Sequence, residues 1–212
     1  MKRISLLLGL LVAFNQAFAQ ETVADRPRKL KQLYLSMGIG GSFTNGNHMN
    51  SSGGNSALHI TAALPKNNLL RAGIIGVAFP DTQPASEKWK KDNHRLNMVP
   101  MHHLGTYFLA VGKQYSIEKL LQFQILAGPG YTIFEEPINV HQETLDLVVA
   151  AYPVLDCDFK VHKKPGILFQ AEAMVLPTRF AGITVGSYYH FVPKISNGGL
   201  TVSLNLGLLK RN

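Results

Sequence analysis

The nine residues from Leu200 to Leu208 alternate strictly between aliphatic side chains and small or polar ones. Successive side chains of a β-strand point to opposite faces of its sheet, so this segment is predicted to be a strand with one wholly aliphatic face. In a soluble protein that face would line the core, whereas in a membrane barrel it would meet lipid. One strand does not distinguish these arrangements, but the rest of the chain does.

The N-terminus has the three parts of a secretory signal peptide. Met1–Arg3 is basic, residues 5–14 are apolar but too few to span a bilayer, and Ala17-Phe18-Ala19 is an A-x-A cleavage site. We expect residues 1–19 to be removed, residues 20–31 to form a charged flexible leader, and residues 32–212 to form one barrel domain. No later stretch approaches the ~18–20 apolar residues of a transmembrane helix, so insertion into a membrane would require strands.

Nine strand-like runs separated by turn residues are predicted after the leader. They cover residues 32–43, 56–64, 69–79, 101–113, 120–134, 145–161, 166–176, 181–192 and 199–208. Turns are indicated at Pro65–Asn68, His162–Gly166 and Pro193–Gly198. The first connections alternate between long and short, as in a barrel with short turns at one rim and longer loops at the other. Because an even strand number is expected, either one run does not span or a tenth strand lies near residues 95–99.

The two faces of these runs differ in a way that favours a membrane barrel. The apolar faces carry almost no charge, and a Lys or Arg facing lipid at the midplane would cost about 2–4 kcal/mol. The opposite faces predict an interior network of paired polar side chains, namely Gln122, Gln124, Asp156, Asp158, Lys160, Gln170 and Glu172. Asp156 and Asp158 share a face about 7 Å apart, so a glycosidase-like carboxylate pair is the alternative. Aromatic residues near the run ends predict girdles at headgroup depth, namely Phe43, Phe79, Tyr131, Phe134, Phe180, Tyr188, Tyr189 and Phe191.

The chain resembles a small outer-membrane β-barrel protein of a diderm bacterium, of the OmpA- and OmpX-like or porin type. The resemblance rests on the signal ending Ala-Phe-Ala-Gln, the opening strand Leu33–Phe43 and the closing strand that leads into Gly207–Asn212. It implies an all-β fold, an antiparallel up-and-down transmembrane β-barrel of about 8–10 strands, inserted by the barrel assembly machinery. The chain departs from the pattern by ending on Asn212 and not on an aromatic residue. Pro129 and Pro153 also lie inside expected strands, where each would need a bulge.

Three functions remain open. The first is an integral outer-membrane protein without enzymatic activity, with a structural, surface-interaction or limited-permeation role and no wide channel. The second is a lipid-modifying enzyme of the outer membrane, such as a deacylase or acyltransferase. That enzyme would need a Ser and a His base on one strand face, and no His-x-Ser occurs in the chain. The third is a soluble periplasmic barrel that binds a lipophile, in which the apolar faces would point inward.

The expected partners are outer-membrane lipids and lipopolysaccharide, because the formal net charge is +8 and the basic residues are scattered through predicted turns. Nucleic acid is not an expected partner of an exported chain, and a monomer is expected. A loop with the only Trp predicts surface contacts through Lys88, Trp89, Lys90, Lys91 and Arg95. No cofactor or metal is expected, since adjacent His102 and His103 point to opposite faces of a strand. The single Cys157 precludes an intramolecular disulfide.

Overall fold

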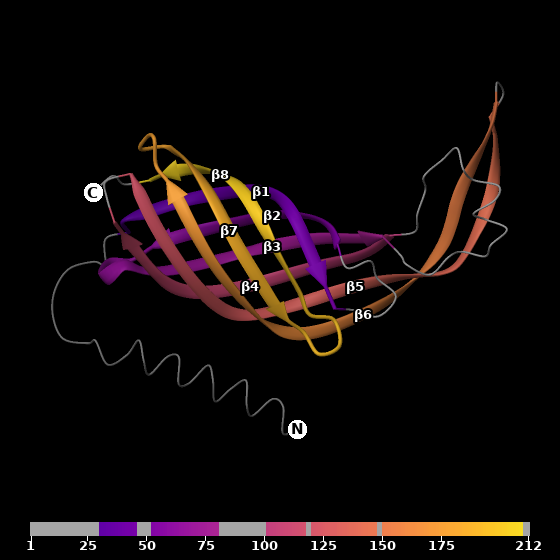
Figure 1. Cartoon of the computed structure of the whole chain (residues 1–212), viewed down its shortest axis with the longest axis horizontal. Coiled ribbons are helices and arrows are strands. Elements are labelled where there is room, and N and C mark those ends of the chain that lie inside the picture. Colours follow the sequence, from indigo (N-terminus) through magenta and orange to yellow (C-terminus); the bar gives the residue numbers. More distant parts are fainter. Residues whose placement is uncertain (1–29, 46–51, 81–100, 118–119, 148–149, 210–212) are drawn as a thin grey trace.

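A computed structural model describes residues 30–45, 52–80, 101–117, 120–147 and 150–209, with the side chains of 139–157 outside the described part. Eight antiparallel strands form a closed barrel in which each strand pairs with its sequence neighbours and the last strand pairs with the first (Figure 1). The strands are β1 (Gln32–Thr44), β2 (Ser52–Ala63), β3 (Asn68–Pro80), β4 (Met101–Ser116), β5 (Leu121–Leu147), β6 (Ala150–Val175), β7 (Ala181–Phe191) and β8 (Asn197–Leu208). The predicted signal peptide, most of the leader and the possible tenth strand lie outside the described residues.

The predicted all-β, up-and-down barrel is confirmed, with eight strands in place of the nine runs counted in the sequence. Residues 150–161 of one predicted run and residues 166–175 of the next belong to one strand, β6, whereas residues 145–147 lie in β5. The turn predicted at His162–Gly166 is wrong, because these residues pair with Gly130–Phe134 of β5. Its Pro165 is tolerated in a strand because β6 acquires its second neighbour, β7, only from Ile167 onward.

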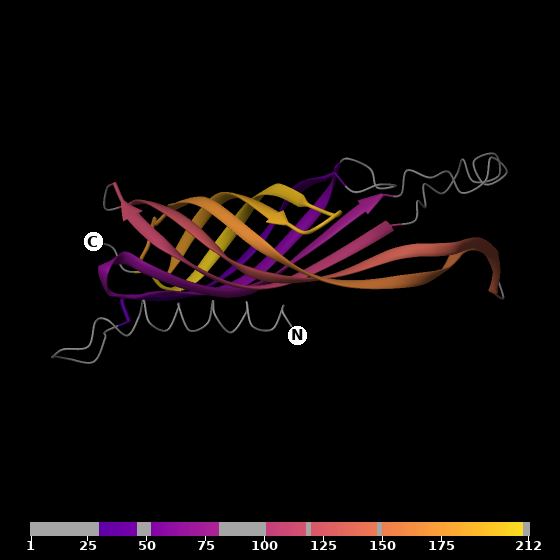
Figure 2. The same ribbon diagram turned by 90° about the horizontal axis from the view of Figure 1, so that it is seen from below.

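Strands β5 and β6 are far longer than the others. They contain 27 and 26 residues, whereas about 9–11 residues suffice for a tilted strand to cross a bilayer. The pairing of β4 with β5 ends at Glu135, and the pairing of β7 with β6 begins at Ile167. Beyond these points β5 and β6 pair only with each other, and Figures 1 and 2 show them leaving the barrel as a two-stranded ribbon. We call residues 136–147 and 150–166 the hairpin extension.

The bulges predicted at Pro129 and Pro153 are absent. Pro129 pairs with Ile167 of β6, and the register between β4 and β5 is unchanged across it, although the ladder is interrupted there. Pro153 pairs with Thr144 in the hairpin extension. Each strand there has one open edge, where the missing N–H of a proline breaks no hydrogen bond of the sheet. The irregularity of this pair of strands lies instead between Ile138 and His141.

The aliphatic faces of β1 and β8 point away from the barrel axis. Ile39 is 74% exposed and Val202 is 53% exposed, while the neighbouring small and polar residues of β1 and β8 face inward. This orientation is the one predicted for a membrane barrel. The soluble lipophile-binding barrel is therefore wrong, because it requires these same faces to line the interior.

The two rims of the barrel differ in their connections. Short turns join β2 to β3, β4 to β5 and β6 to β7, and the described ends of the chain, Leu30 and Leu209, lie at the same rim. We call this the short-turn rim, and the opposite one, from which the hairpin extension leaves, the long-loop rim. Within the described residues, no helix has the length and apolar character needed to cross a membrane.

Candidate functional site: the barrel interior

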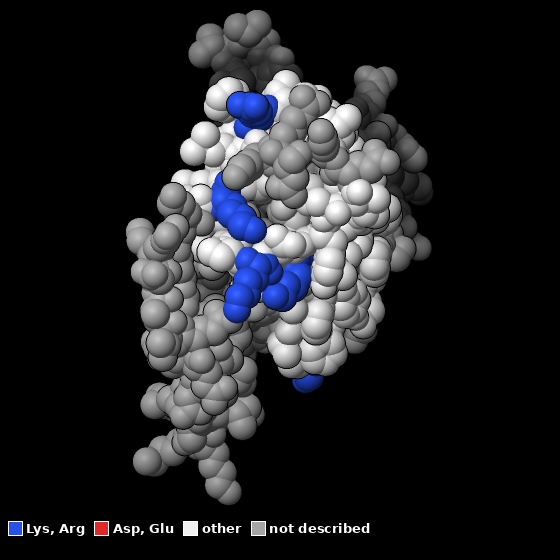
Figure 3. Space-filling model, turned by 90° about the vertical axis from the view of Figure 1, so that its left-hand side faces the viewer, with Lys and Arg blue, Asp and Glu red and all other residues white. Residues whose placement is uncertain are grey.

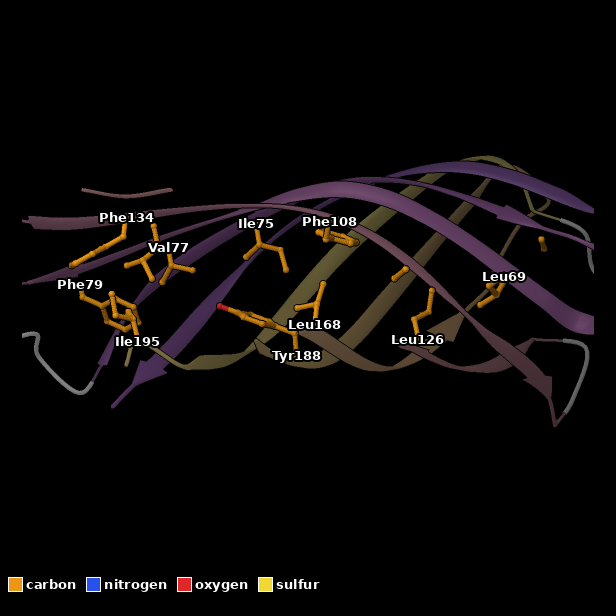
Figure 4. Close-up of a cluster of buried hydrophobic side chains, with 13 residues drawn as sticks. Leu69, Ile75, Val77, Phe79, Phe108, Leu126, Phe134, Leu168, Tyr188 and Ile195 are labelled. Atoms are coloured by element: carbon orange, nitrogen blue, oxygen red, sulfur yellow. The ribbon is translucent and has the colours of Figure 1, made fainter. Parts of the chain in front are cut away.

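Apolar side chains fill much of the lumen along its length. Figure 4 shows the larger cluster pointing inward from several strands: Ala63, Leu69, Ile75, Val77, Phe79, Leu104, Phe108, Ala110, Leu126, Phe134, Leu168, Tyr188 and Ile195. A smaller cluster of Tyr34, Met174, Leu176 and Leu209 lies toward the short-turn rim. Side chains therefore pack the lumen on both sides of its central polar layer.

The central polar layer is built around a buried ion pair. Arg71 of β3 is 1% exposed, and its guanidinium donates to both carboxylate oxygens of Glu172 on β6, at 2.5 and 2.8 Å. A charge buried at this depth is costly unless it is paired and hydrogen-bonded. The two-point contact supplies that compensation, since Arg and carboxylate match in a fork geometry.

The remaining donors of Arg71 reach three neutral acceptors. Its Nε donates to Thr61 Oγ1 at 2.9 Å, and its terminal nitrogens donate to Gln170 Oε1 at 3.1 Å and Gln124 Oε1 at 2.8 Å. Gln124 in turn contacts the Tyr34 hydroxyl at 2.8 Å and Gln114 at 3.3 Å. The layer thus joins side chains from β1 to β6.

A second set of hydrogen bonds connects the other two strands, β7 and β8, to β1. Ser36 of β1 donates to Asn205 of β8 at 2.5 Å, and Asn205 donates to Thr184 of β7 at 2.6 Å. Together the two networks connect all eight strands through the lumen. The bonds of Arg71 to Glu172 and Gln124, and of Gln124 to Tyr34, join strands that are not neighbours in the sheet.

The space left within this layer is small. A cavity of about 10 Å³ is lined by His59, Gln170, Glu172, Thr184 and Ser203, among others. That is the volume needed for about one water molecule. His59 Nδ1, which is buried and has no hydrogen-bond partner within the described part of the protein, belongs to a residue of this lining. The described lumen is packed, and its geometry does not resemble a water-filled channel.

The structure separates the predicted network residues into two groups. Gln122, Gln124 and Gln170 are buried in the barrel with Glu172. Asp158 and Lys160 are exposed on the hairpin extension, and the side chain of Asp156 lies outside the described part. The assignment of Asp158 and Lys160 to the interior is corrected. Residues 162–166 continue β6 beyond the rim, so the residues before them lie outside the barrel. Asp158, one member of the predicted carboxylate pair, is accordingly not part of an enclosed site.

Arg71, the central residue of the network, was not predicted from the sequence. A signal was present, since Arg71 lies between outward-facing Leu70 and Ala72 in an apolar run and alternation would direct it inward. Its pairing with Glu172 depends on the barrel closing, and no local pattern contains that information.

The predicted aromatic girdles are partly corrected. Phe79, Phe134 and Tyr188 are buried in the lumen, because strand alternation and not position near a strand end decides their direction. Phe43, Tyr131, Tyr189 and Phe191 are exposed toward the long-loop rim, and Phe180 is exposed at the short-turn rim. Tyr115, exposed near the short-turn rim, was not predicted.

The remaining candidate sites give no chemical centre in the described residues. His102 is buried and His103 is exposed, so their rings lie on opposite faces of β4 as predicted. Among the side chains that the structure describes, no three His, Cys, Asp or Glu residues are grouped to hold a metal ion. The predicted contact residues Lys88, Trp89, Lys90, Lys91 and Arg95 lie outside the described part.

A closed eight-stranded meander with a filled lumen and an apolar exterior is the fold of the small outer-membrane β-barrels. The solved structures that share it with this chain include the following two. One is Ail, the attachment invasion locus protein of Yersinia pestis, in complex with the heparin analogue sucrose octasulfate, with a TM-score of 0.54 at 9% identity over 85% of this chain and 100% of Ail. The other is Neisserial surface protein A, with a TM-score of 0.50 at 10% identity over 82% of this chain and 96% of that protein. No family model and no curated protein matches the sequence.

Proposed function

We propose that this protein is an integral outer-membrane barrel without enzymatic activity, which closes its lumen and presents the hairpin extension outside the membrane. The observation that carries the proposal is a belt of exposed large apolar side chains with members on all eight strands, among them Ile39, Ile60, Leu70, Leu109, Ile125, Phe169, Val185 and Val202. Soluble monomers rarely expose contiguous apolar patches larger than a few hundred Å². Lipid around the belt removes this surface from water.

The orientation follows from the connections. Barrels of this type have short periplasmic turns and longer external loops, so the short-turn rim would face the periplasm. The hairpin extension then stands outside the cell, and lipopolysaccharide and other outer-membrane lipids surround the belt. Insertion by the barrel assembly machinery fits this placement.

Membrane integration is tested by fractionation of cells that express the protein. We expect it to remain with outer membranes through carbonate washing and to change its gel mobility on heating in detergent. Recovery in the osmotic-shock fluid would contradict the proposal.

The packed lumen supports a structural or surface role over permeation. In planar bilayers the protein should show no ion conductance above that of the bilayer alone, because the apolar clusters and the Arg71–Glu172 layer obstruct the described lumen. A steady open conductance would overturn this part of the proposal. Lipid A from cells with and without the gene, compared by mass, tests the enzyme alternative, and an unchanged acyl pattern is expected.

The hairpin extension supports interaction through its side chains. Phe159 and Val161 are exposed on it beside Lys160 and Lys163, and this mixture of apolar and charged groups suits a protein contact. Its backbone edges carry prolines at 137, 153 and 165. Prolines and lysines at open edges discourage indiscriminate strand pairing.

A second candidate, binding of a sulfated polysaccharide, is favoured by the lysines at the long-loop rim. Lys164 donates to the carbonyl of Pro193 at 3.4 Å, which brings the base of the hairpin extension beside the turn that carries Lys194. Lys160 and Lys163 lie on the same ribbon. The solved Ail structure that shares this fold contains a heparin analogue.

This second candidate is tested by titrating sucrose octasulfate into the purified protein in detergent. We expect binding by the unmodified chain and weaker binding by the variant K160Q/K163Q/K164Q/K194Q. A variant neutralised at the short-turn rim, K31Q/K66Q/K113Q/R179Q, is the matched control and should bind as the unmodified chain does. Absent binding, or equal loss in both variants, would exclude a sulfate site on the long-loop rim.

A further inference from the structure

The charged side chains of the described residues divide unequally between the two rims. The long-loop rim and the hairpin extension carry both signs, with Lys160, Lys163, Lys164 and Lys194 beside Glu135, Glu136 and Asp158. The short-turn rim carries Lys31, Lys66, Lys113 and Arg179, and no Asp or Glu is found there among the described side chains. Figure 3 views this end of the barrel and shows the basic side chains gathered on it. The excess positive charge of the described barrel surface is therefore concentrated at one rim.

These four residues occupy neighbouring positions around the rim. Lys31 precedes β1, and its N–H bonds to the carbonyl of Ala63 at the end of β2. Lys66 lies in the turn between β2 and β3, and Lys113 Nζ reaches the carbonyl of Lys66 at 3.5 Å. Arg179 lies in the turn between β6 and β7, where its carbonyl accepts from the N–H of Leu209, which follows β8. The basic arc defined by these residues therefore runs from the β6–β7 turn to β4.

Two members of the basic arc stand on the lipid-facing surface. Lys31 shares the outward face of its segment with Leu33, and Lys113 shares the outward face of β4 with Leu109. On both strands the outward face changes from aliphatic to cationic as it reaches the short-turn rim. Long Lys side chains can keep their methylene groups on an apolar surface and place the amine at the membrane interface.

Aromatic residues mark the same depth. Tyr115 follows Lys113 on the outward face of β4, and Phe180 follows Arg179 in its turn, both highly exposed. Aromatic side chains of membrane proteins collect at the level of the lipid headgroups. The amines and the guanidinium of the basic arc therefore lie at the depth where lipid phosphates occur.

We propose that the basic arc binds the phosphate groups of anionic phospholipids in the leaflet that surrounds the short-turn rim. The inference rests on the membrane insertion put forward under the proposed function. Juxtamembrane Lys and Arg residues attract anionic headgroups, and this attraction is screened by salt. Phospholipid is the favoured ligand over a soluble periplasmic anion because Lys31 and Lys113 project from the lipid-facing side.

The proposal is tested by lipid selectivity in vesicles of phosphatidylcholine that contain the protein. Spin-labelled phosphatidylglycerol or spin-labelled phosphatidylcholine is added, and electron spin resonance measures the fraction of each that the protein immobilises. We expect a several-fold preference for phosphatidylglycerol at low salt, which falls toward unity in K31Q/K66Q/K113Q/R179Q and in high salt. The variant K160Q/K163Q/K164Q/K194Q has the same change in net charge and should keep the preference.

The outcomes separate this inference from the proposed function. Heat-modifiable gel mobility of the vesicle-bound protein shows whether the barrel has inserted, so failure to insert counts against the proposed function. An inserted barrel with no preference for phosphatidylglycerol, or with equal loss in both variants, would overturn the basic arc as a phospholipid site. A third outcome is that the protein shows no lipid preference but cosediments with purified peptidoglycan, and that only K31Q/K66Q/K113Q/R179Q loses this cosedimentation. That outcome would identify peptidoglycan, and not phospholipid, as the ligand of the basic arc.

Discussion

The inner and outer faces of the same eight strands stabilise the barrel in opposite ways. Inward residues such as Arg71 and Glu172 depend on specific partners, and each buried donor or acceptor would be costly without one. Outward residues such as Ile39 and Val202 have no such partners and depend on the medium around them. Inward side chains therefore select, through their hydrogen bonds, which strands are joined across the lumen. Outward side chains determine the medium in which the barrel is stable.

Removing one member of the buried ion pair is expected to have the largest effect. Glu172→Leu leaves the Arg71 charge without its carboxylate and should lower the free energy of unfolding by about 3–5 kcal/mol. Urea unfolding in detergent micelles, followed by the gel mobility of the folded form, measures the loss. The double variant R71M/E172L removes both charges and should recover most of it. A single variant as stable as the unmodified chain would show that the pair does not brace the lumen.

A charge placed on the outer face should cause the second-largest loss of stability. Val202 lies near the middle of β8 and faces outward, so Val202→Arg should cost about 2–4 kcal/mol in lipid vesicles. Val202→Ala is the matched control and should have a much smaller effect. In a water-soluble barrel the same Arg would be harmless, because the side chain is already exposed. Unchanged stability of Val202→Arg in vesicles would therefore argue against lipid around this face.

Two glycines sharpen the comparison because one faces each side. A Cβ at Gly38 would lie 2.2 Å from Ser203 Oγ and 2.7 Å from Thr201 Cγ2, whereas a Cβ at Gly105 would meet nothing within 4 Å. Gly38→Val should therefore lower stability by about 1–3 kcal/mol through overpacking. Gly105→Val should leave it unchanged or slightly raised, since Val suits a strand and faces open space. Chemical denaturation of both variants checks the difference, and equal losses would contradict it.

Alternation in the sequence was sufficient to predict the outward faces of strands such as β1 and β8, because that choice is local to the strand. The pairing of Arg71 with Glu172 could not be predicted in the same way, since it joins residues on β3 and β6 across a closed lumen. The turn predicted at His162–Gly166 was also wrong, so the end of the barrel strand was misplaced. Those residues have turn-forming chemistry, but the long β5 partner holds them in register. Asp158 and Lys160 were consequently assigned to the interior.

The smallest effect on stability is expected in the hairpin extension, where β5 and β6 pair only with each other and not with β4 or β7. Ile138 and Asp158 are directly paired, so residues 139–157 can be replaced by Asn-Gly, a dipeptide suited to a two-residue hairpin turn. The shortened chain keeps every pair of β5 with β4 and of β6 with β7. Its unfolding free energy should change by no more than about 0.5 kcal/mol, as for surface changes remote from the core. A larger loss would mean that the hairpin extension supports the barrel, and that its length is explained by stability and not by contacts made outside the membrane.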